Sequence, residues 1–93
     1  MKFDEAFDRA KSEKTKKERG LDFIEARSIW LDENCVTLPA KNIEGEFRWF
    51  TVGKMGEKLW VSIWTYRRED YVRIISVRRA EGTPFERCYY ESQ

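Results

Sequence analysis

The least interrupted run of apolar residues lies between residues 58 and 80, KLWVSIWTYRREDYVRIISVRRA. Aromatic and β-branched residues occupy both odd and even positions of this run, before and after an Arg-Glu-Asp sequence at 68–70. Residues of these types suit a pleated and buried surface. The pattern therefore predicts a central antiparallel hairpin of two long strands that turns over at residues 68–70.

Two further segments have the alternation of strands. Residues 47–52 place apolar side chains on both faces and lead through a turn at 53–57 into the central hairpin. Residues 35–38 form a shorter apolar run that Pro39 stops or confines to a sheet edge, because proline cannot donate a backbone hydrogen bond. Together these segments predict a meander of three or four antiparallel strands.

The N-terminal third has the spacing of two helices. Asp4 is a plausible N-cap for a first helix at residues 5–19, and Gly20 suits the left-handed position that ends a helix. Asp22 and Glu25 have the three-residue spacing of a capping box and predict the start of a second helix.

A short C-terminal helix is expected from residue 84 to about residue 91. Thr83 supplies an N-cap, Pro84 suits the first helical position, and Glu86 suits the first turn. The element order predicts an α+β fold with helices mainly on one face of the sheet. With 93 residues, the chain has room for a single domain.

The residue types that the chain lacks restrict its possible catalytic chemistry more than its net charge does. The chain has 18 basic and 17 acidic residues, a net charge of +1, so any nucleic-acid contact has to come from local clusters of cations. It has no histidine, which removes the commonest general base and metal ligand, and its two cysteines do not form a metal motif. We expect no metal, no cofactor, no membrane segment and a cytoplasmic location.

Register arithmetic predicts where the basic side chains gather. If residues 68–70 form the turn, the residue numbers of each pair that faces across the two strands add up to about 138. Arg67 then lies opposite Tyr71, and Arg78 lies opposite Trp60.

The same reasoning around residues 54–57 places Arg48 near Ile63. Two basic clusters result, at ends of the sheet roughly 23 Å apart. The cluster near residues 68–70 comprises Arg48, Arg67, Arg68 and Arg73, and the cluster near residues 53–57 comprises Lys54, Lys58, Arg78 and Arg79.

Each basic residue also has a purely structural interpretation. Arginines at strand ends often pair with glutamates or cover aromatic rings. Lys17 and Arg19 lie in the polar second half of the first helix, where cations stabilise a helix C-terminus. The tryptophans and phenylalanines can form the core, or they can provide platforms on which RNA bases stack.

Five segments in this order resemble the BrnT family of bacterial type II toxin ribonucleases, which have a RelE-like fold. The resemblance covers nearly the whole chain. Its segments are FDEAFDRAKSEKTKKERGLDFIEARSIWLDE at 3–33, GEFR at 45–48 with VG at 52–53, WTYR at 64–67, RIISVRRA at 73–80 and ERCYYE at 86–91. The resemblance implies a metal-independent endoribonuclease that stops translation, and a ribbon-helix-helix antitoxin similar to BrnA. A larger toxin-antitoxin complex would then contact operator DNA through the antitoxin.

RNA supplies its own nucleophile, the 2′-hydroxyl, so the protein needs to orient the backbone and stabilise charge on the phosphate. Arginine suits this task because its planar fork holds two phosphate oxygens and stays protonated. The candidate catalytic residues are Arg78, Arg79, Tyr90 and Arg67. The candidate RNA-binding residues are Lys54, Lys58, Arg48, Arg73, Lys17 and Arg19. The alternative is a toxin-fold module with little or no catalysis that acts by binding an antitoxin or nucleic acid.

Overall fold

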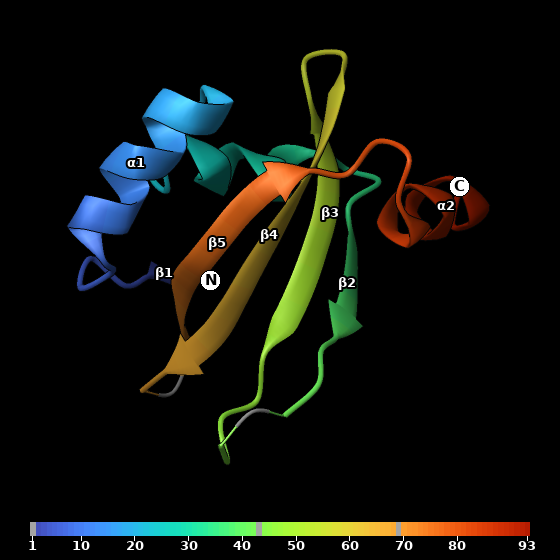
Figure 1. Cartoon of the computed structure of the whole chain (residues 1–93). Helices are drawn as coiled ribbons and strands as arrows, with labels where there is room; N and C mark the ends of the chain where they lie inside the picture. Colours follow the sequence, from blue (N-terminus) through green and yellow to red (C-terminus); the bar gives the residue numbers. More distant parts are fainter. Residues whose placement is uncertain (1, 43, 69) are drawn as a thin grey trace.

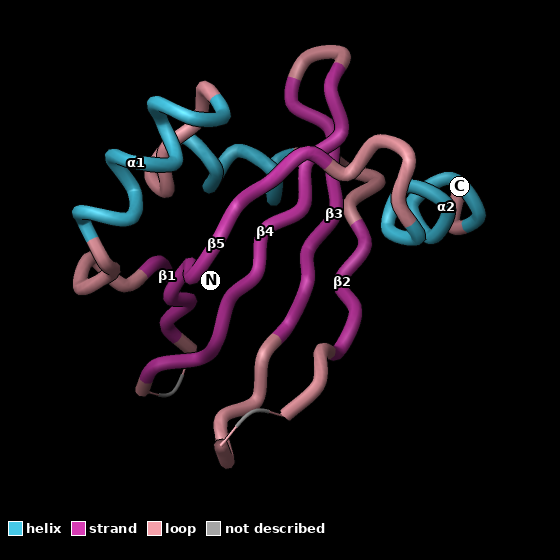
Figure 2. The backbone as a smooth tube through the Cα atoms, in the orientation of Figure 1, coloured by secondary structure: helices cyan, strands magenta, loops and turns pink. Residues whose placement is uncertain are grey.

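A computed structural model describes residues 2–42, 44–68 and 70–93. Figures 1 and 2 show a sheet flanked by helices. The elements in chain order are β1 (Lys2–Phe3), α1 (Arg9–Arg19), the 3₁₀ helix η1 (Glu25–Leu31), β2 (Val36–Pro39), β3 (Trp49–Met55), β4 (Lys58–Arg67), β5 (Tyr71–Arg79) and α2 (Pro84–Glu91). Among the described residues, no helix is long and apolar enough to cross a membrane.

The sheet has five strands in the order β1-β5-β4-β3-β2. Strands β2 to β5 form the predicted antiparallel meander, with β2 at one edge. The expectation of a purely antiparallel sheet was wrong, because β1 pairs parallel with β5 and Asp4 donates its backbone N–H to the carbonyl of Val72. A strand of two residues is too short to show any alternation of apolar and polar positions, so no sequence pattern predicted it.

The first helix begins four residues later than predicted. Its N-cap is Asp8, whose side chain accepts a hydrogen bond from the N–H of Lys11 at 3.0 Å. Asp4 lies outside the helix because its carboxylate pairs with Arg73 at 3.1 Å and accepts the N–H of Ala6. The end was predicted correctly: Gly20 adopts a φ of 87° and donates to a carbonyl of the last turn.

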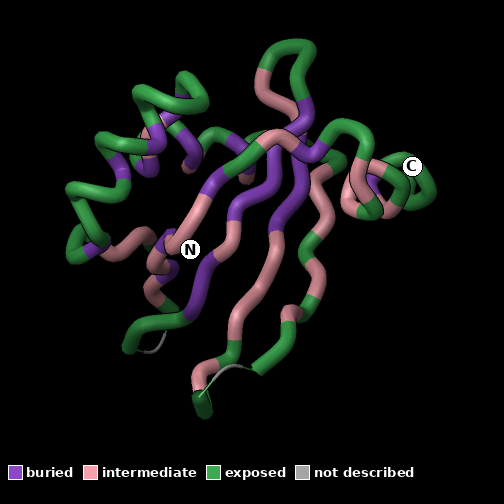
Figure 3. Tube along the Cα trace, viewed as in Figure 1, coloured by how far each residue is buried: buried purple, intermediate pink, exposed green. Residues whose placement is uncertain are grey.

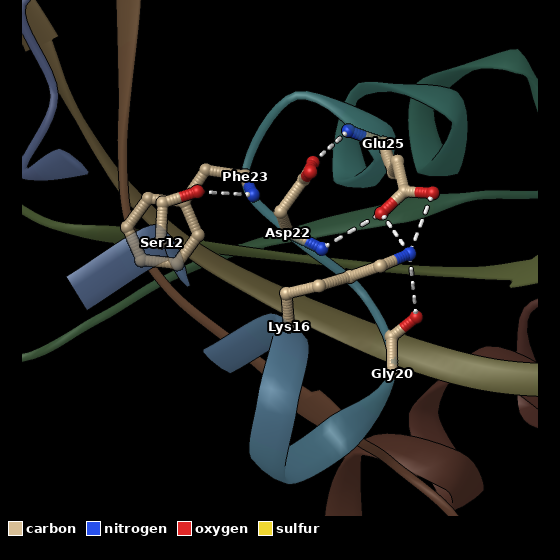
Figure 4. A network of polar contacts seen from close by, with 6 residues as sticks. All are labelled: Ser12, Lys16, Gly20, Asp22, Phe23 and Glu25. Carbon is tan, nitrogen blue, oxygen red and sulfur yellow. Dashed lines mark hydrogen bonds and ion pairs between the residues drawn. The ribbon is translucent and has the colours of Figure 1, made fainter. Parts of the chain in front are cut away.

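The capping box at the start of the second helical segment is confirmed. The N–H of Glu25 donates to Asp22 at 2.8 Å, and the N–H of Asp22 donates to Glu25 at 3.1 Å. Figure 4 shows that Lys16 of α1 reaches the same Glu25 carboxylate, while Ser12 accepts the N–H of Phe23. These bonds join α1 to η1. The segment itself is a 3₁₀ helix, tighter than the helix we expected.

The C-terminal helix begins as predicted. Thr83 is the N-cap of α2 and accepts the N–H of Glu86, and Pro84 occupies the first helical position.

The helices cover both faces of the sheet. On one face, α1 and η1 bury a cluster that includes Phe23, Ile29, Trp60, Trp64 and Val77. On the other, α2 covers a smaller cluster comprising Val52, Leu59, Val61, Ala80 and Tyr89. Figure 3 shows that the buried residues are concentrated in the central strands and in the helical segments that pack on them. We call these two sides the α1 face and the α2 face.

The register of the central hairpin matches the prediction only near its turn. Arg67 lies opposite Tyr71, as expected, although the predicted turn includes Glu69, which lies outside the described residues. Arg78 lies opposite Val61, so its placement opposite Trp60 was wrong. The cause is an irregularity next to Ile63, which shifts the register by one residue.

The turn between β3 and β4 is tighter than predicted. Met55 pairs with Lys58, so only Gly56 and Glu57 form the connection. The register is therefore shifted by two residues, and Phe50 rather than Arg48 lies opposite Ile63. The predicted position of Arg48 was therefore wrong, and Arg48 itself precedes the first residue of β3.

Close approach of β3 to η1 generates a stability prediction. A Cβ atom on Gly53 would lie 2.8 Å from the carbonyl oxygen of Ile29 and 3.2 Å from Cβ of Cys35. We expect Gly53→Ala to lower the free energy of unfolding by about 1–3 kcal/mol, because backbone atoms cannot move aside as a flexible side chain can. Urea denaturation followed by circular dichroism measures the change.

Gly56→Ala is the comparison variant for this prediction. A Cβ atom on Gly56 would meet nothing within 4 Å. Any loss of folding free energy in Gly56→Ala therefore comes only from the strain of placing alanine at a φ of 63°. An unchanged urea midpoint for Gly53→Ala would contradict the close packing of β3 on η1.

Candidate functional site

Arg78 is an accessible cation on a rigid part of the fold. It lies near the end of β5, on the α2 face, opposite the fully buried Val61. Its guanidinium lies 5.6 Å from the ring centre of Phe85 in the first turn of α2. The side chain is exposed, and within the described chain it has no acidic partner. Arg78 can therefore meet an anion from solvent without first breaking an ion pair.

Arg79 is held differently. It lies opposite Trp60 on the α1 face, and its guanidinium is 5.5 Å from the Trp60 ring. It forms a salt bridge with Glu81, and this hydrogen bond lowers the pKa of the Glu81 carboxyl. The neighbouring arginines thus point to opposite faces, as strand geometry predicts, and Arg79 already has an acidic partner.

Tyr90 lies with Lys54 rather than with Arg78. The ammonium of Lys54 is 5.3 Å from the Tyr90 ring centre, and Tyr90 is half exposed. Tyr90 follows Phe85 by five residues on α2, which corresponds to about 7.5 Å along the helix axis. Arg78 and Lys54 therefore lie beside opposite ends of α2. Lys58 is exposed at the beginning of β4.

Arg67 belongs to the other end of the sheet. Arg67, Arg68 and Arg73 line a pocket of about 310 Å³ together with Asp4 and Tyr66. We call this the arginine pocket.

Two of the predicted RNA-binding arginines have acidic partners at this end. Arg73 pairs with Asp4 at 3.1 Å, and Arg48 pairs with Glu46 at 3.5 Å. The structure thus separates Arg67 from Arg78, and the four candidate catalytic residues do not form one cluster.

The two candidates on α1 also differ from each other. Arg19 donates a hydrogen bond of 2.6 Å to the carbonyl oxygen of Val77, so it occupies part of the β5 edge that β1 leaves uncovered. Lys17 is exposed and lines a shallow pocket beside Phe7 and Ile24. Arg19 has a structural role in this arrangement, whereas Lys17 remains available to a ligand.

The sequence interpretation missed an interaction that attaches α2 to the sheet. The Asp32 carboxylate accepts hydrogen bonds from the backbone N–H of Lys54 and from the hydroxyl of Tyr89, each at 2.8 Å. Burial opposes ionisation of Asp32, but these bonds and one from the Asn34 N–H outweigh it and lower the pKa. Burial and Asp32 raise the pKa of Tyr89 to about 12. No local pattern links residues 57 positions apart.

Other chemistry-bearing groups are sparse in the described ranges. Within them, no three histidine, cysteine, aspartate or glutamate side chains are grouped to hold a metal ion. Cys35 and Cys88 are free thiols, and burial raises the pKa of Cys35.

Comparison with known families identifies the chain. A family model described as the ribonuclease toxin BrnT of type II toxin-antitoxin systems matches residues 7–83. The chain belongs to the BrnT family. No curated protein gives a significant match. The match covers every strand except β1, and it includes Arg78 and Arg79 but ends before α2.

Membership of the BrnT family makes this chain a ribonuclease toxin by family, with an antitoxin partner and an RNA substrate. The accessible cations on the sheet are suited to a polyanion of that kind. Arg78 lies within the matched residues, whereas Tyr90 and Tyr89 lie beyond them.

The Asp32–Tyr89 interaction predicts a pH-dependent contribution to stability. We expect Tyr89→Phe to lower the free energy of unfolding by about 1–2 kcal/mol at pH 8, because Asp32 loses one hydrogen bond. The folded-state pKa of Tyr89 is raised, so the hydroxyl contribution is complete below pH 10 and is lost as the pH approaches about 12. Urea denaturation at pH 8 and at pH 11.5 measures both effects.

Tyr90→Phe is the matched control, because it removes the same hydroxyl from an exposed neighbour. Its effect should stay within about 0.5 kcal/mol. An equal loss for both variants, or a Tyr89→Phe deficit that does not shrink at high pH, would contradict this account of how α2 is held.

Proposed function

We propose that this BrnT protein is a RelE-like, metal-independent endoribonuclease that cleaves RNA and thereby inhibits translation. Arg78 is the principal residue that stabilises charge on the scissile phosphate. The observation that carries this proposal is the exposed guanidinium of Arg78 on a strand whose opposite residue, Val61, is fully buried. A cation fixed in this way needs little reorganisation when a phosphate arrives.

The proposed reaction uses the 2′-hydroxyl of the substrate. Its oxygen attacks the adjacent phosphorus as its proton leaves, the bond to the 5′ oxygen breaks, and that oxygen takes up a proton. The products are a 2′,3′-cyclic phosphate and a 5′-hydroxyl. Negative charge grows on the non-bridging oxygens during attack, where the Arg78 fork can donate two hydrogen bonds. Correct placement of the 2′-oxygen supplies much of the remaining rate enhancement.

Arg79 has a secondary role in this proposal. Its pairing with Glu81 means that an RNA phosphate has to compete with a carboxylate for the guanidinium. When a phosphate replaces the Glu81 carboxylate on Arg79, the ion pair that is lost offsets the one that is gained. The phosphate therefore gains less binding free energy than it would at a cation that has no acidic partner. Arg79 would therefore position Glu81 and the β5 end more than it would bind the scissile group.

Lys54 and Tyr90 would bind RNA at the far end of α2. The Lys54 ammonium lies against the Tyr90 ring, which presents a cation and a hydroxyl on one exposed surface. Lys58, exposed at the β3–β4 turn, extends the same positive region. An RNA backbone that crosses α2 would meet Arg78 at one end of the helix and Lys54 at the other. Beside Lys54, Tyr90 could donate a hydrogen bond or a proton to the RNA.

We propose that the antitoxin is of the ribbon-helix-helix class and neutralises the toxin by covering the Arg78 end. An acidic, amphipathic segment that folds on binding suits a cation-rich sheet rim. Operator DNA would be contacted through the antitoxin, because a toxin with a net charge of +1 has little general affinity for DNA.

Arg78→Ala tests the proposed function directly. Expression of the wild-type protein should arrest growth and generate new RNA 5′-hydroxyl ends, whereas Arg78→Ala should reduce cleavage by at least roughly a hundredfold, typical for loss of one charge-stabilising donor. Ligation-based mapping of 5′-hydroxyl ends in the induced cultures makes the measurement.

Arg87→Ala serves as the matched control, because Arg87 is an exposed arginine of α2 whose guanidinium is directed to Glu91. It should cleave like the wild type. If Arg78→Ala kept full cleavage while losing only antitoxin affinity, the protein would instead be the catalytically weak binding module, and the nuclease assignment of Arg78 would fail.

The absence of histidine predicts the shape of the pH–rate profile. Histidine is the side chain that ordinarily titrates near pH 6.5, so cleavage of a short RNA should show no bell centred there. The log rate should rise with pH as the 2′-hydroxyl becomes easier to deprotonate. Initial rates between pH 5.5 and 9 at constant ionic strength provide the test, and a sharp bell near pH 6.5 would count against an arginine-based site.

A further inference from the structure

An aromatic pocket lies at the end of the sheet away from Arg78. It has a volume of about 510 Å³, and its walls include Phe47, Trp49 and Tyr66. Phe47 is 68% exposed and Tyr66 is 47% exposed, although both are large aromatic side chains. Neither contributes much to the core, so their exposure at one site calls for a functional explanation. We call this site the aromatic pocket; its walls come from the start of β3, the end of β4 and the segment that precedes β3. These ends of β3 and β4 are the lower ones in Figure 1.

Two rings of the aromatic pocket, those of Trp49 and Tyr66, are held by the core beneath them. Trp49 stacks on the buried Trp64 with a centroid separation of 6.0 Å and an interplanar angle of 24°. Tyr66 meets the same Trp64 edge-on at 4.9 Å. Trp64 is itself fixed by a hydrogen bond of 2.8 Å from its indole N–H to Thr51. These contacts create an ordered aromatic surface that is open to solvent.

Tyr66 also lines the arginine pocket, so the two hollows share one wall. In the arginine pocket, Asp4 pairs with Arg73. Over residues 2–42, 44–68 and 70–93, neither Arg67 nor Arg68 forms a salt bridge, and both are exposed. A π surface therefore lies directly beside two accessible guanidinium groups. A nucleotide has the complementary pair of features, a planar base and a phosphate.

We propose that these two pockets form a nucleotide-binding subsite for single-stranded RNA. A base stacks on Tyr66 and the adjoining rings, and its phosphate binds Arg67 and Arg68. Stacking of a base on an aromatic side chain tolerates any sequence, and cations beside it follow the backbone. This inference rests on the proposed function, since it assigns part of the RNA substrate to a second location, remote from Arg78.

The acidic side chains of the aromatic pocket fix the orientation of the nucleotide. Glu44 and Glu46 lie on its wall, and Glu46 already pairs with Arg48 at 3.5 Å. A phosphate near Glu44 would be repelled, so the phosphate lies on the Arg67 side and the base lies toward Phe47. A carboxylate at that position can also accept a hydrogen bond from an exocyclic base amine.

Binding of modified RNA tests the subsite without cleavage. The probe is a fluorescein-labelled eight-nucleotide oligoadenylate with 2′-O-methyl groups, which block the 2′ nucleophile, and a matched oligomer with abasic positions lacks the bases. Anisotropy titrations at fixed salt give both dissociation constants. Tyr66→Ala should weaken binding of the oligoadenylate about tenfold and leave binding of the abasic oligomer unchanged, since only the stacking contribution is removed.

Three further variants separate stacking from other effects. Tyr66→Phe should bind both oligomers like the wild type, because it keeps the ring. Arg67→Ala should weaken both oligomers, because it removes a phosphate contact. Leu31→Ala, which changes an apolar side chain that is 80% exposed and lies in η1, should change neither. If Tyr66→Ala did not fold, Phe47→Ala would take its place with the same expectation.

The outcomes distinguish this subsite from the proposed function. Equal affinity of Tyr66→Ala and wild type for the oligoadenylate would overturn the subsite, even if Arg78-dependent cleavage were confirmed. Ring-dependent binding by a wild-type protein that does not cleave unmodified RNA would support the subsite while refuting the nuclease proposal. If Tyr66→Ala lost antitoxin binding but kept its affinity for the oligoadenylate, the aromatic pocket would be a protein-docking surface. This result would also overturn the inference.

Discussion

Burial of the β4–β5 pair on both faces is the constraint on which the rest of this structure depends. Trp60, Trp64 and Val77 face α1 and η1, while Leu59 and Val61 face α2. Charged side chains are costly in such a strand pair unless they are paired, so cations are displaced to the strand ends. The middle of the β4–β5 pair, residues 59–66 and 74–77, carries no charged side chain, and exposed arginines remain at both ends. The same alternation sends Arg78 and Arg79 to opposite faces, which leaves Arg78 accessible and Arg79 beside Glu81.

Local signals in the sequence predicted the elements well. Gly20, the Asp22–Glu25 capping box and Thr83 each act within a few residues, and the structure shows each of them at the expected position. Features that depend on tertiary partners were missed. Asp4 is a chemically suitable N-cap, but its salt bridge with Arg73 engages it elsewhere and moves the helix start to Asp8. The register shift near Ile63 has no sequence signature, because an additional apolar residue in an apolar strand does not alter the pattern.

The same distinction applies to the candidate site. Residue chemistry could identify arginine as the residue type for a phosphate, and strand parity could separate Arg78 from Arg79. It could not show that Arg19 is engaged by the carbonyl of Val77 or that Tyr90 lies over Lys54, because these contacts depend on how helices dock on the sheet. Docking of α2 in turn depends on the Asp32–Tyr89 hydrogen bond, which joins the end of η1 to the last turn of α2.

In the proposed RNA-binding surface, the cations lie at two separate ends of the sheet. Tyr66 lies opposite Val72, and Arg78 follows six residues later on β5, a span of roughly 20 Å in a strand. Tyr66 packs on Trp64 on the α1 face, whereas Arg78 lies on the α2 face, so an RNA that meets both has to pass from one face of the sheet to the other. An RNA that reaches only one end gains only that end's contacts. An RNA that reaches both converts the second contact into an intramolecular one, so its affinity rises without any new type of interaction. If both proposed contacts form, a protein with a net charge of +1 would favour single strands long enough to reach both ends, and an antitoxin that covers one end would abolish the combined binding.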